Sequence, residues 1–254
     1  MPKKAKHPVE TSRKTIRILE ALRESEGGRL TDLASALDMN KSTVHNHLST
    51  LKEEELVVRD GPRYELGLRL LEFGGGVRRR RQIYRVARPE VERLADQTGE
   101  LATLVVGEHG LGVVLVCERG DQAVNLDVYP GLRRRLHLTA PGKAILAHLP
   151  SDRVDGIVDR RGLDAETRHS VTEREELDAQ LAEIRDRGFA VDEEELITGL
   201  RAVGAPVLAE DGTMLGAIGV AQPTSRLDDD RFFEEVPDVV RSVANVIELN
   251  INYS

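Results

Sequence analysis

Residues 39–51, MNKSTVHNHLSTL, gather short hydrogen-bonding side chains along one predicted helix. At about 100° per residue, the apolar residues Val44, Leu48 and Leu51 fall within roughly 60° of one another on a helical wheel. The remaining face carries donors and acceptors with almost no net charge: Ser42, Thr43, His45, Asn46, Ser49 and Thr50. A solvated helix usually repeats Glu, Lys and Arg at i,i+4 instead. The helix is therefore suited to hydrogen bonding with another polar molecule, although a polar surface helix in a bundle is the alternative.

Two further helices precede this one. Residues 11–25 place apolar side chains at helical spacing, with Thr11 or Ser12 available as the N-cap. Residues 30–38 predict a second, shorter helix with Thr31 as its N-cap. The side chains expected to face the core are Ile16, Ile18, Leu19, Leu22, Leu33, Ala34 and Leu37. This core would pin the apolar stripe of the third helix.

Residues 56–66, LVVRDGPRYEL, predict a β-hairpin whose two runs flank the turn DGP. Three helices followed by a hairpin are typical of a winged helix-turn-helix. In that motif the third helix reads base edges in the major groove, and the hairpin reaches phosphates or the minor groove. The residues expected to contact DNA are Thr31, Lys41, Ser42, Thr43, His45, Asn46, Ser49, Thr50, Arg59, Arg63 and Tyr64.

The charge is unevenly distributed along the chain. Residues 1–80 carry 16 Lys and Arg against 12 Asp and Glu, whereas the remaining residues carry 20 against 32. A basic first third favours an N-terminal domain that binds a polyanion, joined to an acidic domain. The alternative is that composition merely drifts between the domains. The overall net charge of −8 would also suit a high-salt cytoplasm. Full stability near zero KCl would contradict that idea.

Several classes of protein and site are excluded. The chain has no run of 18 apolar residues, and its basic N-terminus lacks the apolar stretch of a secretory signal, so we expect a cytoplasmic protein without a membrane partner. The single Cys117 excludes an internal disulfide and a cysteine-based zinc site. His45 and His47 are two residues apart and cannot form an i,i+4 metal pair. No catalytic motif or nucleotide loop occurs, so we expect no enzyme, catalytic residue, metal or cofactor.

The rest of the chain predicts a second domain behind a linker. We expect domains at residues 1–66 and 85–254, joined by a linker helix over 67–84 that the glycines at 74–76 could interrupt. A further helix should end near Gly99. Three strand-like runs are expected within 101–129, helices at 140–149, 151–160, 173–187 and 228–250, and strands near 188–192, 201–208 and 213–221. Antiparallel strands with helices on one face indicate an α+β sensory-type domain.

The stretch LHLTAPGKAILA, residues 136–147, has the features of a helix start that binds an anion. Thr139 can cap, Pro141 suits the first turn, and Ala140 and Gly142 leave the backbone uncovered. Exposed N–H groups at a helix N-terminus attract a carboxylate or phosphate. An ordinary well-capped helix remains the alternative from these residues alone.

The blocks STVHNHLSTL, YELGLRLLEFG, LHLTAPGKAILA, GFAVDEEELITGLRAVGAPV and GAIGVAQPTSRL occur in this order along nearly the whole chain. Together they resemble IclR-type transcriptional regulators. The resemblance implies an α+β protein with a winged helix-turn-helix DNA-binding domain, a linker helix, and a GAF-like domain with an antiparallel sheet and flanking helices. It also implies homodimers or homotetramers on double-stranded operator DNA, controlled by a small effector.

By this resemblance the effector-binding residues are Thr139, Ala140, Pro141, Gly142, Asp192, Glu195, Ala202, Gly219 and Ala221. Asp192 would accept hydrogen bonds from effector hydroxyls, and the effector is expected to carry a carboxylate. Two positions depart from the family pattern. Asn46 stands where Arg is frequent, which would exchange a guanine or phosphate reader for an adenine reader. His47 replaces a usually apolar residue and is expected to be structural.

The sequence thus predicts a DNA-binding transcriptional regulator modulated by a small, carboxylate-containing metabolite. One alternative is an enzyme that uses its winged helix only for docking. That enzyme would need a nucleophile–base pair or a metal cluster in residues 85–254. The other alternative is a ligand-independent architectural DNA-binding protein, for which no small molecule would shift the melting temperature saturably.

Overall fold

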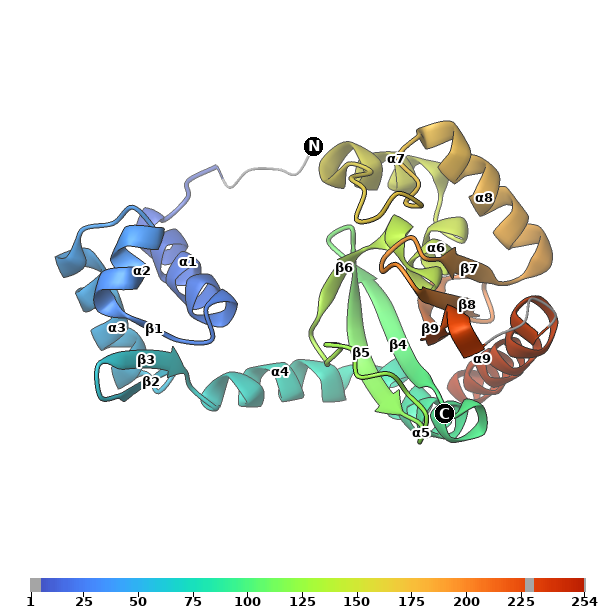
Figure 1. The fold of residues 1–254 in the computed structure, drawn as a ribbon, viewed down its shortest axis with the longest axis horizontal. Coiled ribbons are helices and arrows are strands. Elements are labelled where there is room, and N and C mark those ends of the chain that lie inside the picture. Colours follow the sequence, from blue (N-terminus) through green and yellow to red (C-terminus); the bar gives the residue numbers. More distant parts are fainter. Residues whose placement is uncertain (1–5, 227–230, 254) are drawn as a thin grey trace. The chain divides into compact units, whose positions relative to one another are not determined.

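The computed structural model describes residues 6–226 and 231–253. It divides into two compact units, and the boundary along the chain lies between Val77 and Arg78 (Figure 1). Separate hydrophobic clusters form the cores of the two units. A helix with the length and apolarity needed to span a bilayer does not occur in either described range.

The first unit contains the three predicted helices and the predicted hairpin. Its elements are α1 (Glu10–Glu24), β1 (Gly28–Arg29), α2 (Leu30–Ala36), α3 (Lys41–Glu53), β2 (Val57–Asp60) and β3 (Arg63–Leu66). Strands β2 and β3 form the hairpin, and the unpredicted strand β1 pairs with the other edge of β3. This arrangement confirms the predicted winged helix-turn-helix.

The apolar stripe of α3 lies at the centre of this unit's core. Its three residues are buried together with Ile18 and Leu22 of α1. The prediction that Ile16 faces the core is wrong, since this side chain is exposed. Ile18 and Leu22 are four residues apart and share a face, whereas Ile16 lies about 200° from Ile18 around the helix.

The predicted N-caps of the first two helices are also wrong. The caps are Val9 for α1 and Arg29 for α2, and neither makes a side-chain capping hydrogen bond. Thr11 and Ser12 lie inside the first turn of α1, and Thr31 lies inside α2. A hydroxyl caps a helix only where the chain turns from extended to helical, and here that turn comes earlier.

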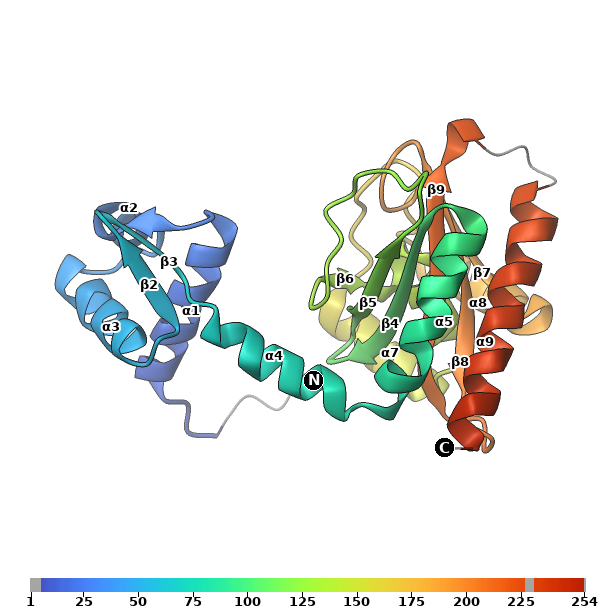
Figure 2. The same cartoon turned by 90° about the horizontal axis from the view of Figure 1, so that it is seen from below.

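Helix α4 (Arg69–Arg80) runs through its three glycines without interruption (Figure 2). A Cβ built at any of them would meet no other atom within 4 Å. The chain leaves the helical conformation only at Arg81 (φ −77°, ψ 121°), before α5 (Gln82–Thr98) begins. The helix expected over 67–84 is therefore two helices. The second ends at Gly99 in a left-handed conformation (φ 73°), as predicted.

The second unit is built on one six-stranded antiparallel sheet with the order β6-β5-β4-β9-β8-β7. Its strands are β4 (Leu101–Glu108), β5 (Leu111–Arg119), β6 (Arg133–Arg135), β7 (Ala190–Glu193), β8 (Leu200–Leu208) and β9 (Met214–Pro223). Strand β9 pairs with β4 although more than 90 residues separate them along the chain. The two halves of the unit therefore share one sheet.

The third strand expected before residue 129 is absent from the structure. Residues 121–129 have no regular secondary structure, and the short strand β6 takes the edge beside β5 instead. The guanidinium of Arg119 donates to the carbonyls of Leu126 (2.6 Å) and Val128 (3.5 Å). Those carbonyls therefore bond to a side chain rather than to a neighbouring strand.

Helices cover both faces of this sheet, which corrects the expectation of helices on one face. Helices α5 and α9 (Val236–Asn252) pack on one face, and α6 (Ala140–Ala147), α7 (Ser151–Arg161) and α8 (Arg174–Arg187) on the other (Figure 1). Shorter helical turns are Leu136–Leu138, Thr224–Arg226 and Arg231–Glu235. The predicted start of the last helix at 228 lies outside the described residues, and α9 itself begins at Val236.

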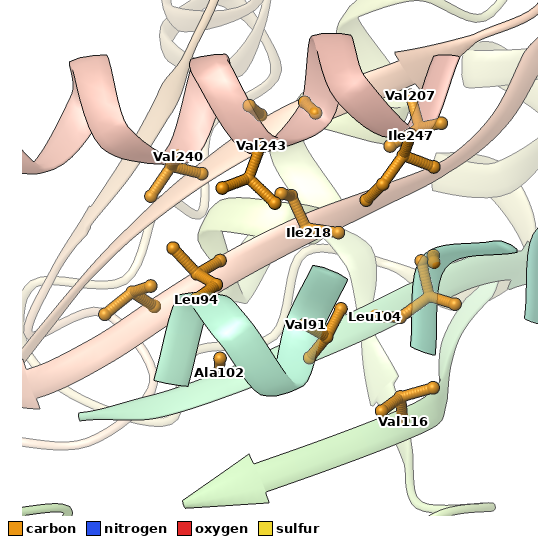
Figure 3. Packing of buried hydrophobic residues seen from close by; sticks show 14 of the residues in the cluster. Val91, Leu94, Ala102, Leu104, Val116, Val207, Ile218, Val240, Val243 and Ile247 are labelled. Atoms are coloured by element: carbon orange, nitrogen blue, oxygen red, sulfur yellow. The ribbon is translucent and has the colours of Figure 1, made fainter. Parts of the chain in front are cut away.

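The core on the α5 and α9 face is closed and apolar. Val91 and Leu94 of α5 meet Val240, Val243 and Ile247 of α9 over the sheet (Figure 3). Full burial of each large side chain stabilises the fold by about 1.5–3 kcal/mol. This face anchors the sheet, and the opposite face is left to form a cavity.

Candidate functional site

Helix α3 presents its polar face outward from the first unit. The side chains of Lys41, Ser42, His45, Asn46, Ser49 and Thr50 are exposed, and that of Thr43 is half-buried. The hydroxyl of Thr50 donates to the Asn46 carbonyl at 3.2 Å. Over the described ranges, the side chains of Ser42, Asn46 and Ser49 make no hydrogen bond within the protein. Their donors and acceptors are available to another molecule.

His47 joins α3 to α1. Its Nδ1 lies 2.9 Å from the hydroxyl of Thr15, and its side chain is half-buried. This contact supports the structural role expected for His47 rather than a role in contacting DNA.

The hairpin residues divide into exposed and structural ones. Arg59 is exposed, donates to the Gly61 carbonyl at 2.9 Å, and lies over the ring of Tyr64. The guanidinium of Arg63 bonds the Gly27 carbonyl at 3.0 Å. Tyr64 is only 7% exposed and belongs to the core, so the expectation that it contacts DNA needs correction. Strand alternation places it on the buried face of β3.

Thr31 is exposed on α2, where its hydroxyl donates to the carboxylate of Asp32 at 3.1 Å. Thr31 therefore lies on the surface of the first unit, but its hydroxyl hydrogen already bonds Asp32.

The second unit contains a cavity of about 220 Å³ between its sheet and the start of α6. Residues opposite one another on paired strands share a face of the sheet. The register places Asp192, Ala202, Ala221 and Leu101 in one row and Gly204, Gly219 and Thr103 in the next. Seven of the nine predicted effector residues line the cavity: Thr139, Ala140, Pro141, Asp192, Ala202, Gly219 and Ala221. Gly142 and Glu195 do not line it.

Glycines let α6 approach the sheet closely. A Cβ at Gly219 would lie 2.5 Å from Cγ of Pro141, and one at Gly204 would lie 2.5 Å from the Pro141 nitrogen. No real Cβ is accommodated at such distances without movement of the helix. Gly219 therefore sets the height of the cavity roof as well as part of its floor.

The N-terminus of α6 has fewer free donors than its sequence suggested. The hydroxyl of Thr139 accepts from the Gly142 N–H at 3.1 Å, which confirms the predicted cap. The Lys143 N–H bonds the Thr139 carbonyl at 2.8 Å, and Pro141 has no N–H. Of the first turn, at most the Ala140 N–H is left for a ligand.

Three buried charged side chains lie close together at the cavity wall, and Asp192 is the one that lines the cavity. Asp192 is 6% exposed, and its Oδ1 accepts from the Glu195 N–H at 2.7 Å. Lys143 forms an ion pair with the Glu195 carboxylate and donates to Oε1 of Gln180 at 3.0 Å. Burial, with a smaller contribution from the negative Glu195, raises the pKa of Asp192 to about 7. Burial also raises the pKa of Glu195, although Lys143 opposes the rise.

Further lining residues were not predicted. Thr103 lies at the centre of the floor beside Gly219, and Arg134 of the edge strand lies opposite Gly112. Leu126, Asp127 and Val128 close another side. The alternation of each strand was visible in the sequence, but the partner strands that bring these residues together were not.

Metal binding has no support from the side chains present. Over residues 6–226 and 231–253, no group of three or more His, Cys, Asp or Glu side chains is placed to hold an ion. Burial raises the pKa of the Cys117 thiol, which donates to the Val128 carbonyl. A thiol of this kind is a poor nucleophile at neutral pH.

Comparison with known proteins identifies the family. The model of the bacterial transcriptional regulator IclR C-terminal domain matches residues 76–249, and that of the IclR helix-turn-helix domain matches residues 13–61. The protein named Probable HTH-type transcriptional regulator ArcR of Halobacterium salinarum is 34% identical over 240 residues, which cover 93% of this chain and 91% of that protein.

Solved structures agree over the full length. The crystal structure of IclR from Thermotoga maritima has a TM-score of 0.79 at 27% sequence identity, covering 96% of this chain and 99% of that chain. An IclR homologue from Microbacterium hydrocarbonoxydans, complexed with 4-hydroxybenzoate, shows the same fold with a TM-score of 0.81 at 22% identity, covering 96% of this chain and 100% of that chain. On the two matching domain models and the ArcR relative, the chain belongs to the IclR family of transcriptional regulators.

Proposed function

We propose that this regulator binds operator DNA through α3 and that a small carboxylate-containing metabolite, bound in the cavity of the second unit, changes its DNA affinity. The observation that carries the proposal is the combination of two features in one chain. The second unit has a cavity lined by the buried acid Asp192, and the first unit exposes the polar face of α3. Such an effector shifts DNA binding only by its differential affinity for the DNA-bound and free arrangements.

Asn46 is the proposed base reader. Its amide is exposed at the centre of the polar face of α3 and can bond an adenine edge through two atoms. We expect Asn46→Ala to weaken binding to a duplex selected by the wild-type protein from a random library by about 1–3 kcal/mol. Binding to unselected DNA should be unchanged, because phosphate contacts supply it. Fluorescence anisotropy with both duplexes measures the two effects.

The matched control for this test is Asn125→Ala, which removes an exposed amide from the second unit. It should leave both affinities unchanged. Equal losses for Asn46→Ala on selected and unselected DNA would refute the base-reading role.

The cavity size and lining support a small organic acid as the effector. The volume of about 220 Å³ suits a molecule of modest size, and Arg134 offers a cation at the wall. The 4-hydroxybenzoate complex of the Microbacterium homologue suggests aromatic acids as the first probes, together with aliphatic and sugar acids.

We expect at least one of these acids to raise the melting temperature of this protein saturably. A ligand at 100 times its Kd stabilises the folded state by about 2.7 kcal/mol. The shift should be lost in Asp192→Ala and kept in Asp186→Ala, which changes an exposed acid on α8. A differential scanning fluorimetry panel measures this, and a panel without any saturable shift would contradict the proposal.

Self-association is also proposed, as a homodimer or homotetramer. Supporting it, the described part of the first unit exposes apolar side chains on and beside α4: Leu68, Leu71, Phe73 and Val77. Monomeric proteins rarely leave such a row in water. Light scattering tests this, since a mass near the 28.1 kDa of one chain would refute it.

We also propose three functional parts along the chain. Residues 1–66 bind DNA, residues 67–84 form the linker, and residues 85–254 bind the effector.

A further inference from the structure

We propose that the protein takes up one proton when it binds an anionic effector, and that Asp192 holds this proton at the cavity wall. The inference rests on the proposed function of the cavity as a site for organic acids. It adds that effector binding weakens as the pH rises, and it names the group responsible.

The first observation is a shortage of positive charge around two buried acids. Lys143, Asp192 and Glu195 are 1%, 6% and 5% exposed, and they come from α6, β7 and the turn that follows β7. The Lys143 ammonium is committed to the Glu195 carboxylate and to Gln180. Asp192 instead receives a backbone N–H from Glu195 at 2.7 Å. One lysine therefore balances one of two carboxylates, and Asp192 is the carboxylate left over.

The other charged groups near the cavity do not supply the missing charge. Arg201 of β8 is among the residues that line the cavity, but its guanidinium pairs with Glu193 at 3.5 Å and lies over the Phe232 ring. From β6 and the segment before it, Arg134 and Asp127 line the cavity with opposite charges. Within the described ranges, neither arginine forms an ion pair with Asp192.

An anionic ligand would meet Asp192 inside a cavity that is lined mainly by apolar residues. Two negative charges at close range repel strongly where the dielectric constant is low. Protonation removes the repulsion because it neutralises the Asp192 carboxylate, and the resulting hydroxyl then donates to a ligand oxygen. The proton comes from solvent and binds the Asp192 carboxylate. Its positive charge balances the negative charge that the ligand brings, and the ligand itself is not chemically changed.

The pKa of about 7 places this change in the physiological range. The free protein is then only partly protonated at Asp192 near neutral pH, and ligand binding completes the protonation. As the pH rises above this pKa, the apparent Kd should rise by up to about tenfold per pH unit, because less of the free protein carries the proton.

The experiment has a ligand-free part and a ligand-bound part. Urea unfolding of wild type, Asp192→Asn and the control Asp186→Asn is followed from pH 5 to pH 8. Folded Asp192 keeps a proton that the unfolded side chain releases near pH 4, so wild-type stability should fall as the pH rises towards 7 and then level. The unfolding constant should rise by up to about tenfold per pH unit relative to Asp192→Asn. The control should follow wild type.

The ligand-bound part uses isothermal titration of 4-hydroxybenzoate, benzoate and the acids of the fluorimetry panel. Titrations in phosphate and in Tris, whose ionisation enthalpies differ, count the protons bound. We expect wild type to take up a fraction of a proton near pH 7, and a larger fraction, up to one proton, at pH 8. Asp192→Asn should bind with an affinity independent of pH over this range. The number of protons that wild type takes up tests the inference even if the Asp192→Asn variant fails to fold.

The outcomes separate this inference from the proposed function. An acid that binds wild type without proton uptake and with a flat pH profile overturns the inference and leaves the effector proposal intact. Parallel unfolding curves for wild type and Asp192→Asn overturn the inference as well. Failure of every acid to bind at any pH overturns the effector proposal, and the inference with it. Proton uptake that depends on Asp192 supports both.

Discussion

Replacing Lys143 by Met should destabilise the second unit by about 3–5 kcal/mol at pH 7, the cost of removing one partner from a buried ion pair. Lys143 is among the large side chains that are less than 2% exposed, and its ammonium contacts the Glu195 carboxylate and Gln180. Met has a similar volume and leaves little void. The loss therefore comes from a carboxylate left in an apolar interior without its cation. Urea unfolding followed by circular dichroism measures it.

The double variant Lys143→Met/Glu195→Leu should recover much of that stability, because it removes both charges. The matched control is Arg241→Met, which breaks an exposed pair with Asp238 on α9 and should cost at most about 0.5 kcal/mol. A loss in Lys143→Met no greater than in this control would mean that Glu195 readily takes a proton or reaches water. The buried pair would then contribute nothing to stability.

Replacing Leu48 by Ala should cost the first unit about 2–5 kcal/mol, which is the range for buried Leu→Ala changes that leave a cavity. Leu48 is fully buried in the middle of α3, between that helix and α1. A small domain has only about 5–15 kcal/mol of stability in total, so this variant should lose operator binding well below the melting temperature of wild type. Calorimetry should show the first unit melting earlier while the second is unchanged.

The control for this variant is Ile16→Ala, which truncates an aliphatic side chain of the same size on α1 that is 55% exposed. It should shift the unfolding free energy of the first unit by no more than about 0.5 kcal/mol. A Leu48→Ala protein that melts like wild type and still binds DNA would show that the interior of this unit collapses around the missing side chain. The stripe on α3 would then not be what holds the polar face in position.

The sequence by itself determined the elements whose causes are local. The stripe on α3, the hairpin at its two-residue turn and the Thr139 cap were predicted correctly, because helical period, turn chemistry and capping depend on residues within a few positions of one another. The order of family blocks likewise indicated the two-domain class and seven of the residues that line the cavity. Apart from the third strand expected before residue 129 and the start of the last helix, the helices and strands of the second unit lie close to where they were predicted.

Only the tertiary structure decided which side chains meet. Tyr64 is buried because β3 packs onto the helices, and in residues 121–129, which form no strand, the carbonyls of Leu126 and Val128 bond to Arg119. The pairing of β4 with β9 brings Thr103 beside Gly219. The ion pair of Lys143 with Glu195, 52 residues later, leaves Asp192 as the unbalanced acid. These outcomes depend on strand pairing and burial between distant segments, which local pattern does not specify.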